Sequence, residues 1–279
     1  MLLLSLFLIA LAGFFIFHLV KSRRRKQLLS RPFPEEWDAI LKKNFPIYRK
    51  LPGPMQKRLH PLIHVFIGEK SFEGCGGLEV TEEMKVTIAG QACLLILNAP
   101  KSHVYPKLRS ILIYPTAFKT DTRSSLFHFL SEEEDQQLRL GESWSTGSVI
   151  LAWDNVLHGA HDWKDGHNLV FHEFAHQLDQ SDGSTDGAPK LGSRSRYLSW
   201  ARVLGKEFET LEDRVQRNKK TFFDQYGATD PAEFFAVVTE TFFEKPKTMK
   251  KKYPELYEEF RKFYRLDPVD WKWPEASQN

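Results

Sequence analysis

The chain has 279 residues, a length typical of about two domains, and its 42% hydrophobic and 27% charged content excludes disorder, a collagen-like repeat or a coiled coil as the main architecture. Its two cysteines exclude a disulfide scaffold and a four-cysteine zinc site. The net charge is +3, and five cations lie between Lys21 and Lys26, so the remainder carries −2 and lacks the basic face of a nucleic-acid-binding protein.

The first element is an apolar stretch over residues 1–20 that contains no charged side chain. Twenty helical residues span roughly 30 Å, which is the thickness of the bilayer core, so the stretch predicts a transmembrane anchor. The basic cluster KSRRRK follows the stretch, whereas in a cleavable signal peptide the basic residues come first. Cations that flank a span stay in the cytoplasm, so the sequence predicts a single-pass membrane protein whose remaining domain faces the cytoplasm.

The rest of the chain predicts one helix-rich α+β domain with a small sheet. It comprises a basic juxtamembrane linker over 21–34, the domain over 35–268 and a tail over 269–279. Expected helices are Glu35–Lys43, Pro54–Ile67, Thr81–Leu97, Leu169–Leu178, Tyr197–Arg217, Ala232–Phe243 and Pro254–Tyr264. Expected strands are Ser110–Tyr114 and Ser148–Trp153, with a glycine-rich break at Gly74–Gly77, a solvated acidic loop at Glu132–Asp135 and an exposed lysine-rich face at Lys245–Lys252.

The segment NLVFHEFAHQLD contains His172, Glu173 and His176 in the H-E-x-x-H pattern. Residues four apart share one face of a helix, so the two imidazoles can bind one metal ion. Glu173 lies about 100° further round the helix, beside the metal, where its carboxylate suits a general base that activates water. The apolar residues around the motif predict a buried helix, in which unpaired histidines would be costly.

A catalytic zinc site needs a third protein ligand, and no histidine follows His176. The metzincin subclass is excluded because Asp179 and Asp182 stand where it has glycine and histidine. We interpret Asp179 as a partner that orients a histidine and Asp182 as a loop carboxylate. Glu233 and Glu240 remain as acidic candidates on a later helix.

The segment YGATDPAEFFAVVTETFF begins with Tyr226 and continues into an apolar helix that carries both glutamates on one face. Asp230 and Glu233 have the spacing of a capping box, which is the alternative to a ligand role for Glu233. We expect Glu233 to be the third ligand and Glu240 to be a supporting acid or the alternative ligand. Tyr226 is placed to donate a hydrogen bond to an oxyanion, although a lone tyrosine also fits simple packing.

With these two motifs the sequence resembles the Mlc titration factor A family of bacterial zinc peptidases, and ILIYPTAF, GESWSTGSVILAW and FRKFYRLDP support the likeness, which covers roughly residues 35–268. The resemblance implies a gluzincin-type fold related to the catalytic domain of anthrax lethal factor. It places one zinc ion on His172, His176 and Glu233, the base on Glu173 and a catalytic tyrosine on Tyr226. It implies aminopeptidase action on short peptides, and the enteric family member also binds the repressor Mlc.

Two functions follow from the sequence. The first is a zinc-dependent metallopeptidase, aminopeptidase-like, that acts on a peptide or protein substrate. The alternative is a membrane-tethered module that sequesters a transcriptional regulator and uses zinc only for structure. An intact Glu173 and Tyr226 favour catalysis, because a structural site needs neither. No nucleic-acid partner is expected.

Overall fold

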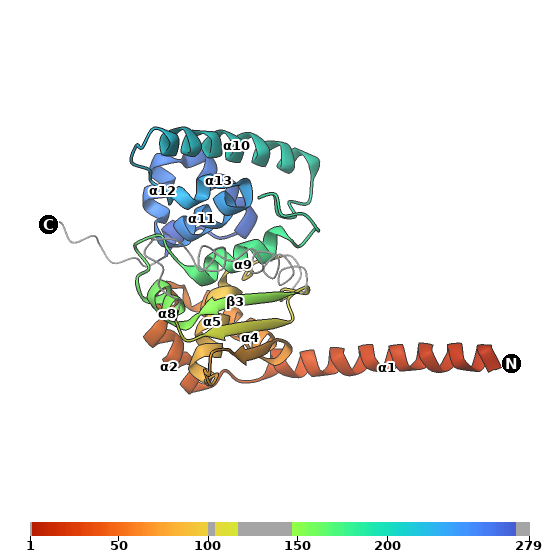
Figure 1. The fold of residues 1–279 in the computed structure, drawn as a ribbon. Helices are drawn as coiled ribbons and strands as arrows, with labels where there is room; N and C mark the ends of the chain where they lie inside the picture. Colours follow the sequence, from red (N-terminus) through yellow and green to blue (C-terminus); the bar gives the residue numbers. More distant parts are fainter. Residues whose placement is uncertain (1, 100–103, 117–146, 272–279) are drawn as a thin grey trace.

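The computed structural model describes residues 2–99, 104–116 and 147–271, which form the helix-rich α+β fold that the sequence predicts (Figure 1). The helices are α1 (Leu2–Ser30), α2 (Glu35–Asn44), α3 (Pro46–Lys50), α4 (Gly53–Glu69), α5 (Glu82–Leu95), α8 (Trp153–His161), α9 (Leu169–Asp179), α10 (Arg194–Gln216), α11 (Pro231–Glu244), α12 (Pro246–Lys252) and α13 (Pro254–Tyr264). The strands are β1 (Ser71–Gly74), β2 (Ser110–Tyr114) and β3 (Ser148–Ala152), and two short 3-10 turns are η1 (Gln225–Ala228) and η2 (Pro268–Asp270).

The three described strands form a parallel sheet in the order β1-β2-β3. Ile111 of β2 lies opposite both Phe72 of β1 and Val149 of β3. Alternate residues of β2 and β3 are buried, so one face of the sheet packs into the core. The chain passes directly from β3 into α8, and both contact α9, which brings the end of the sheet to the helix with the H-E-x-x-H motif.

The N-terminal helix α1 continues through the basic cluster and ends at Ser30. Its first part projects from the body of the molecule (Figure 1), whereas Arg24 and Arg25 contact α4 by a hydrogen bond to the Gly68 carbonyl and an ion pair with Glu69. Among the residues that the structure describes, no helix is long and apolar enough to cross a membrane. The anchor over residues 1–20 stays a prediction from the sequence; in the structure this stretch belongs to α1, whose later residues contact α4.

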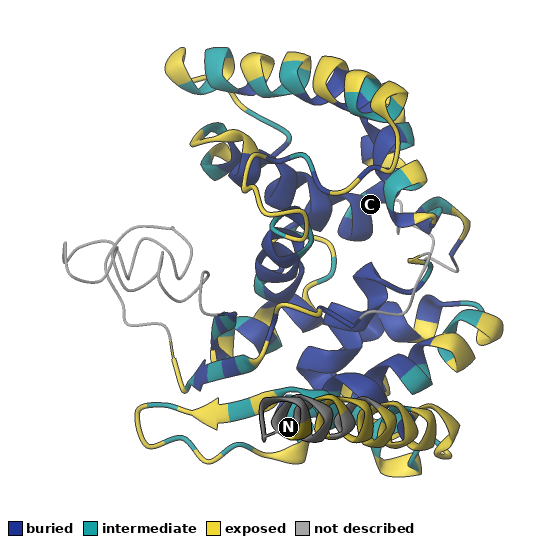
Figure 2. Ribbon diagram, turned by 90° about the vertical axis from the view of Figure 1, so that its right-hand side faces the viewer, coloured by how far each residue is buried: buried dark blue, intermediate teal, exposed yellow. Residues whose placement is uncertain are grey.

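Helices α9 and α11 lie in the middle of the molecule (Figure 1), where most of the ribbon is buried (Figure 2), and α11 is buried from Ala232 to Glu244. Phe171 of α9 packs against Phe243 of α11, with ring centroids 5.1 Å apart. Phe174, one turn further along α9, packs against Tyr105, with ring centroids 4.8 Å apart. Because aromatic contacts hold both helices, the polar side chains that they carry toward each other have little freedom to move.

Polar side chains fix where these two helices begin. Asn168 caps α9 by accepting a hydrogen bond from the Phe171 amide, at 3.0 Å. Asp230 caps α11 by accepting from the amides of Ala232 and Glu233, at 2.8 and 2.9 Å, and Pro231 occupies the first turn. These caps fix the residue at which each helix begins. Since the starting residue determines which side chains lie on which face, the caps also determine where the polar face of each helix points.

The remaining differences from the sequence prediction are short elements. Strand β1 occupies SFEG and ends in the expected glycine-rich break, while α3, α8 and α12 were not expected. The lysine-rich segment is helix α12, and its lysines from Lys247 onward are exposed as predicted, but Lys245 is half-buried and donates to the Asp165 carbonyl. The acidic run at 132–135 lies outside the described residues.

Candidate metal centre

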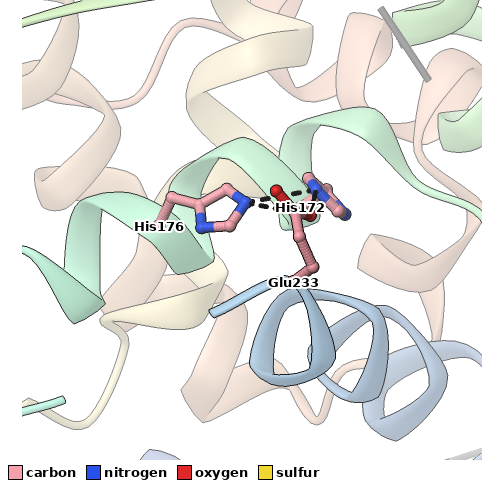
Figure 3. A group of neighbouring side chains, drawn as sticks. All are labelled: His172, His176 and Glu233. Atoms are coloured by element: carbon pink, nitrogen blue, oxygen red, sulfur yellow. Dashed lines mark hydrogen bonds and ion pairs between the residues drawn. The ribbon is translucent and has the colours of Figure 1, made fainter. Parts of the chain in front are cut away.

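The imidazoles of His172 and His176 extend from one face of α9 toward Glu233 in the first turn of α11 (Figure 3). The two Nε2 atoms lie 3.2 Å apart. Glu233 Oε2 lies 2.9 Å from His172 Nε2 and 3.4 Å from His176 Nε2. All three side chains are buried, with 1–5% of their residue surface exposed, so the structure brings together the three residues that the sequence predicts as metal ligands.

The spacing of these three atoms fits a metal ion. Donors about 2.0–2.1 Å from a tetrahedral zinc stand about 3.3 Å from one another, close to the three separations observed. The region also buries five carboxyl groups, on Glu173, Asp179, Glu233, Glu240 and Glu244. A divalent cation would stabilise those of these carboxyl groups that are ionised. The donor set of two histidines and a glutamate is typical of catalytic zinc.

Glu240 orients His172 from the side away from the other ligands. Its Oε1 accepts a hydrogen bond from His172 Nδ1, at 2.8 Å. With a metal bound, the ring would keep its proton on Nδ1 and offer the lone pair of Nε2 as a ligand. Burial alone lowers the pKa of His172, but without a metal the hydrogen bonds to Glu233 and Glu240 outweigh it and raise the pKa well above its ordinary value.

The structure distinguishes the two roles considered for Glu233. The carboxylate of Glu233 points to the two histidines, so the cap of α11 is made by Asp230 alone. Burial raises the pKa of Glu233, but hydrogen bonds from His172 and His176 outweigh it and hold the pKa well below the usual range. Glu240, which contacts the opposite nitrogen of His172, is not among the converging ligand atoms.

Glu173 is 3% exposed, and its Oε1 has no hydrogen-bond partner among the described residues. Burial raises the pKa of Glu173 to about 7, an effect that the two neighbouring histidines oppose. A buried carboxyl group beside a cluster of metal ligands, with one oxygen uncommitted, has the placement that a general base requires. Its role as the base remains a prediction.

A cleft of about 830 Å³ opens beside His172 and Glu240. Its walls come from α8, from the loop before α9, from η1 with the residues before it, and from α11. The lining residues are Asn155, His158, Gly159, Asp165, His167, Asn168, Leu169, His172, Thr221, Phe223, Asp224, Gln225, Tyr226, Val237 and Glu240. The ring of Tyr226 lies 6.0 Å from that of His172, between centroids, so Tyr226 borders both the cleft and the metal ligands.

Two acidic residues after the motif have different roles. Asp179 Oδ2 accepts a hydrogen bond from the Gly187 amide, at 2.9 Å, which fixes the loop after α9. Burial raises the pKa of Asp179 to about 6, while that hydrogen bond and the nearby His176 lower it. The orientation of a histidine by Asp179 stays a prediction. Asp182 is exposed and accepts from the Ser184 amide and hydroxyl, as expected of a loop carboxylate.

Sequence reasoning missed two buried residues next to the site, Asn168 and Glu244. The side chain of Asn168 contacts Glu244, and its backbone amide donates to Glu240. The position of Asn168 immediately before the helix identifies it as a cap. Its partners Glu240 and Glu244 lie 72 and 76 residues away in the chain, and no local sequence pattern reveals such distant contacts.

The chain is similar to several known proteins. An uncharacterized protein of Synechocystis (slr2042) is 44% identical over 247 residues, which cover 88% of this chain and 89% of that protein. Proteins named Mlc titration factor A are 31% identical in Serratia proteamaculans, over 84% of this chain and 88% of theirs, and 30% identical in Cronobacter sakazakii, over 85% and 88%. Residues 19–265, which include the whole ligand cluster and Tyr226, match the model of the glucose-regulated metallo-peptidase M90 family, and the chain belongs to that family.

Proposed function

We propose that this protein is a zinc-dependent peptidase of the gluzincin type with one zinc ion per chain, held by His172, His176 and Glu233. The observation that carries the proposal is the convergence of two imidazole nitrogens and one carboxylate oxygen at tetrahedral spacing beside a cleft. Membership of a metallo-peptidase family supports a metal-dependent hydrolysis of peptide bonds.

The bound zinc would act as a Lewis acid that activates water and polarises the scissile carbonyl. Glu173 takes the proton of the attacking water and returns it to the leaving amine, for which its buried, uncommitted oxygen is suited. Tyr226, which lines the cleft beside His172, donates a hydrogen bond to the developing oxyanion. Glu240 keeps the His172 ring in the orientation that the site needs.

We propose aminopeptidase-like action on short peptides, as the family resemblance implies. The cleft supports a substrate with a positively charged end, because Asp165 and Asp224 line it and none of its lining residues is a lysine or an arginine. The test uses zinc content and turnover of matched peptides with free and acetylated N-termini. Cleavage of the free peptides, loss of activity on chelation and its return with zinc would support the proposal.

Glu173→Gln tests the mechanism, because it preserves shape but removes the basic carboxylate. We expect wild-type zinc content and turnover lowered at least ~100-fold. Tyr226→Phe should keep zinc and slow turnover with little change in KM, because the phenol acts in the transition state. Unchanged cleavage by the Glu173→Gln protein would remove the proposed base.

A second candidate function is sequestration of a transcriptional regulator, which the name of the Mlc titration factor A relatives favours. In that role zinc would serve structure only. A wild-type protein that binds zinc, cleaves neither peptide class and retains a purified Mlc-like repressor would support this alternative over the peptidase.

The membrane association and the cytoplasmic location of the domain remain proposals from the sequence. They rest on the uncharged residues 1–20 and the following basic cluster. A C-terminal fusion to a reporter that is active only outside the cytoplasm tests the orientation, and membrane fractionation tests the association. Strong reporter activity would overturn the cytoplasmic location, and a fully soluble chain would overturn the association.

A further inference from the structure

The metal centre continues into a second layer of buried polar groups. Asn168 is 1% exposed and Glu244 is 3% exposed, and both lie behind Glu240 as seen from the metal ligands. Neither has a role in the chemistry proposed above. A carboxyl group is costly to bury without a compensating function in structure or in the site, so the contacts of Glu244 identify what it holds in place.

Glu244 holds the segment that leads into α9. Its Oε2 accepts a hydrogen bond from the Gly166 amide at 3.0 Å, and its Oε1 accepts from Asn168 Nδ2 at 3.1 Å. The same Nδ2 lies 3.0 Å from both Gln91 Oε1 and the Gly159 carbonyl oxygen. Asn168 is thus fixed to α5, α8 and α11 at once, through one side-chain amide.

Asn168 passes this restraint to the metal ligand by its backbone. Its amide donates to Glu240 Oε2, and Glu240 Oε1 accepts from His172 Nδ1 at 2.8 Å. Its side-chain oxygen also caps α9, the helix that carries both histidines. A continuous path of hydrogen bonds therefore runs from Glu244 through Asn168 and Glu240 to the His172 ring.

We propose that Glu244 is a positioning residue for the metal centre, which through Asn168 holds Glu240, and hence the His172 imidazole, in the orientation that binds the metal. This inference rests on the metal-binding part of the proposed function and not on peptidase activity. Capping α9 needs only the Asn168 oxygen, so the cap alone does not account for a buried carboxyl group at position 244.

The experiment measures zinc affinity of the full chain by competition with a chelator, and the visible absorption of the Co²⁺-substituted protein. Partners that orient a ligating histidine contribute 10–100-fold to metal affinity, and Glu244 lies two contacts further out than Glu240, so we expect Glu244→Ala to weaken zinc binding by about 10-fold, the lower end of that range. It should also change the Co²⁺ bands, which report the ligand geometry. Burial, followed by the charge of Glu240, raises the pKa of Glu244, so Glu244→Gln is its nearest mimic and should retain most of the affinity.

Thr239→Val is the matched control. Thr239 is also buried on α11, but its hydroxyl bonds to the Phe235 carbonyl and the Tyr264 hydroxyl. It should lower stability without changing zinc affinity or the Co²⁺ bands. Should Glu244→Ala fail to fold, Asn168→Ser tests the same link, because serine keeps the cap of α9 but lacks the amide that reaches Glu244. We expect it to weaken zinc binding as well.

A double-mutant cycle with Glu240→Gln tests the route. If Glu244 acts through Glu240, Glu244→Ala should cost less than twofold in affinity in the Glu240→Gln background. An equal loss in both backgrounds would overturn the proposed path, and wild-type affinity in Glu244→Ala would overturn the positioning role. A wild-type chain that binds no metal would overturn the proposed function together with this inference. A wild-type chain that binds zinc while Glu244→Ala keeps the same affinity would overturn this inference alone.

Discussion

Glu233 and Glu240 lie two helical turns apart on α11 and contact opposite nitrogens of His172, at 2.9 and 2.8 Å. Only the Nε2 side can hold a metal shared with His176, so the two glutamates should respond differently to mutation. We expect Glu233→Ala to lose stoichiometric zinc, whereas Glu240→Gln keeps one zinc per chain with 10–100-fold lower affinity. Equilibrium dialysis against zinc measures both. Full zinc affinity in Glu233→Ala would return Glu233 to the capping role.

Asp38 gives a second test at the scale of a residue, far from the metal. It accepts a hydrogen bond from the buried Tyr48 hydroxyl, at 2.7 Å, and pairs with Lys42. Burial raises the pKa of Asp38, but the contacts with Lys42 and Tyr48 outweigh it, so the pKa is lowered in the folded state. The ionised Asp38 carboxylate therefore stabilises the folded state at pH values above its unfolded pKa of about 3.9. This stabilisation is lost as the pH falls through the lower pKa that Asp38 has in the folded state.

We therefore expect Asp38→Asn to lower the free energy of unfolding by about 1 kcal/mol at pH 7, and the difference from wild type to shrink toward pH 3. Urea unfolding of the apoproteins, with chelator present, measures it without interference from metal release. Tyr48→Phe, which removes the phenol but leaves the carboxylate, is the matched control for the hydrogen bond. A difference that stays constant between pH 7 and pH 3 would contradict the assignment.

The sequence was sufficient for residues whose chemistry has a local pattern. His172 and His176 share a helical face by spacing alone, and Glu233 stands on the face of an apolar helix where a carboxylate needs a reason to be buried. The sequence favoured the ligand role of Glu233 over the capping role, but the geometry behind that choice, the position of α9 relative to α11, cannot be read from it. Glu244 could not be found for the same reason.

At the scale of elements, the loop between α9 and α10 ties three helices together at Gly187. Its amide donates to Asp179 at the end of α9, and its carbonyl oxygen accepts from the Trp200 indole of α10, at 2.8 Å. Its φ is +74°, and a Cβ there would lie 2.3 Å from the carbonyl oxygen of Pro231, the first residue of α11. Only glycine allows this close approach.

Gly187→Ala should therefore lower the free energy of unfolding by more than the cost of backbone strain alone. It should also weaken zinc binding, because the clash shifts α11 relative to α9. Gly192→Ala is the control, because Gly192 has a φ of +86° but nothing within 4 Å of the added Cβ. It should cost only the roughly 1–2 kcal/mol of a left-handed alanine, with zinc affinity unchanged. Denaturant unfolding and zinc titration of both variants check this, and equal effects would exclude the steric argument.

The longer elements were predictable because their apolar periodicity extends over several turns, as in α4 and α10. The short elements were not. β1 has four residues, SFEG, of which Phe72 alone is large and apolar, and it is a strand because it pairs with β2. Helix α8 contains Gly159, which weakens its helical pattern, yet a Cβ at Gly159 would lie 2.9 Å from Asn168 Cα, so close packing against the start of α9 accounts for the glycine.

For the whole molecule, the metal would join the two central helices, which come from distant parts of the chain and bury carboxyl groups against each other. Binding to the folded state alone stabilises it by RT ln(1 + [metal]/Kd), or about 4 kcal/mol when free zinc is 1,000 times Kd. For a domain of this size that corresponds to a rise of roughly 10 °C in Tm. Zinc should therefore raise Tm in proportion to the logarithm of its concentration above Kd.

The measurement is thermal unfolding of the full chain with zinc at set free concentrations and with excess chelator. His176→Ala is the control, because it removes one ligand from the centre of the site and should make Tm independent of chelator. The apoprotein should also unfold more readily as the pH rises from about 4 to 6, because burial raises the pKa of Asp179 to about 6, and over this range the unfolded chain releases a proton that the folded chain keeps. A chelator that lowers Tm equally in wild type and His176→Ala would place the stabilising metal outside this centre.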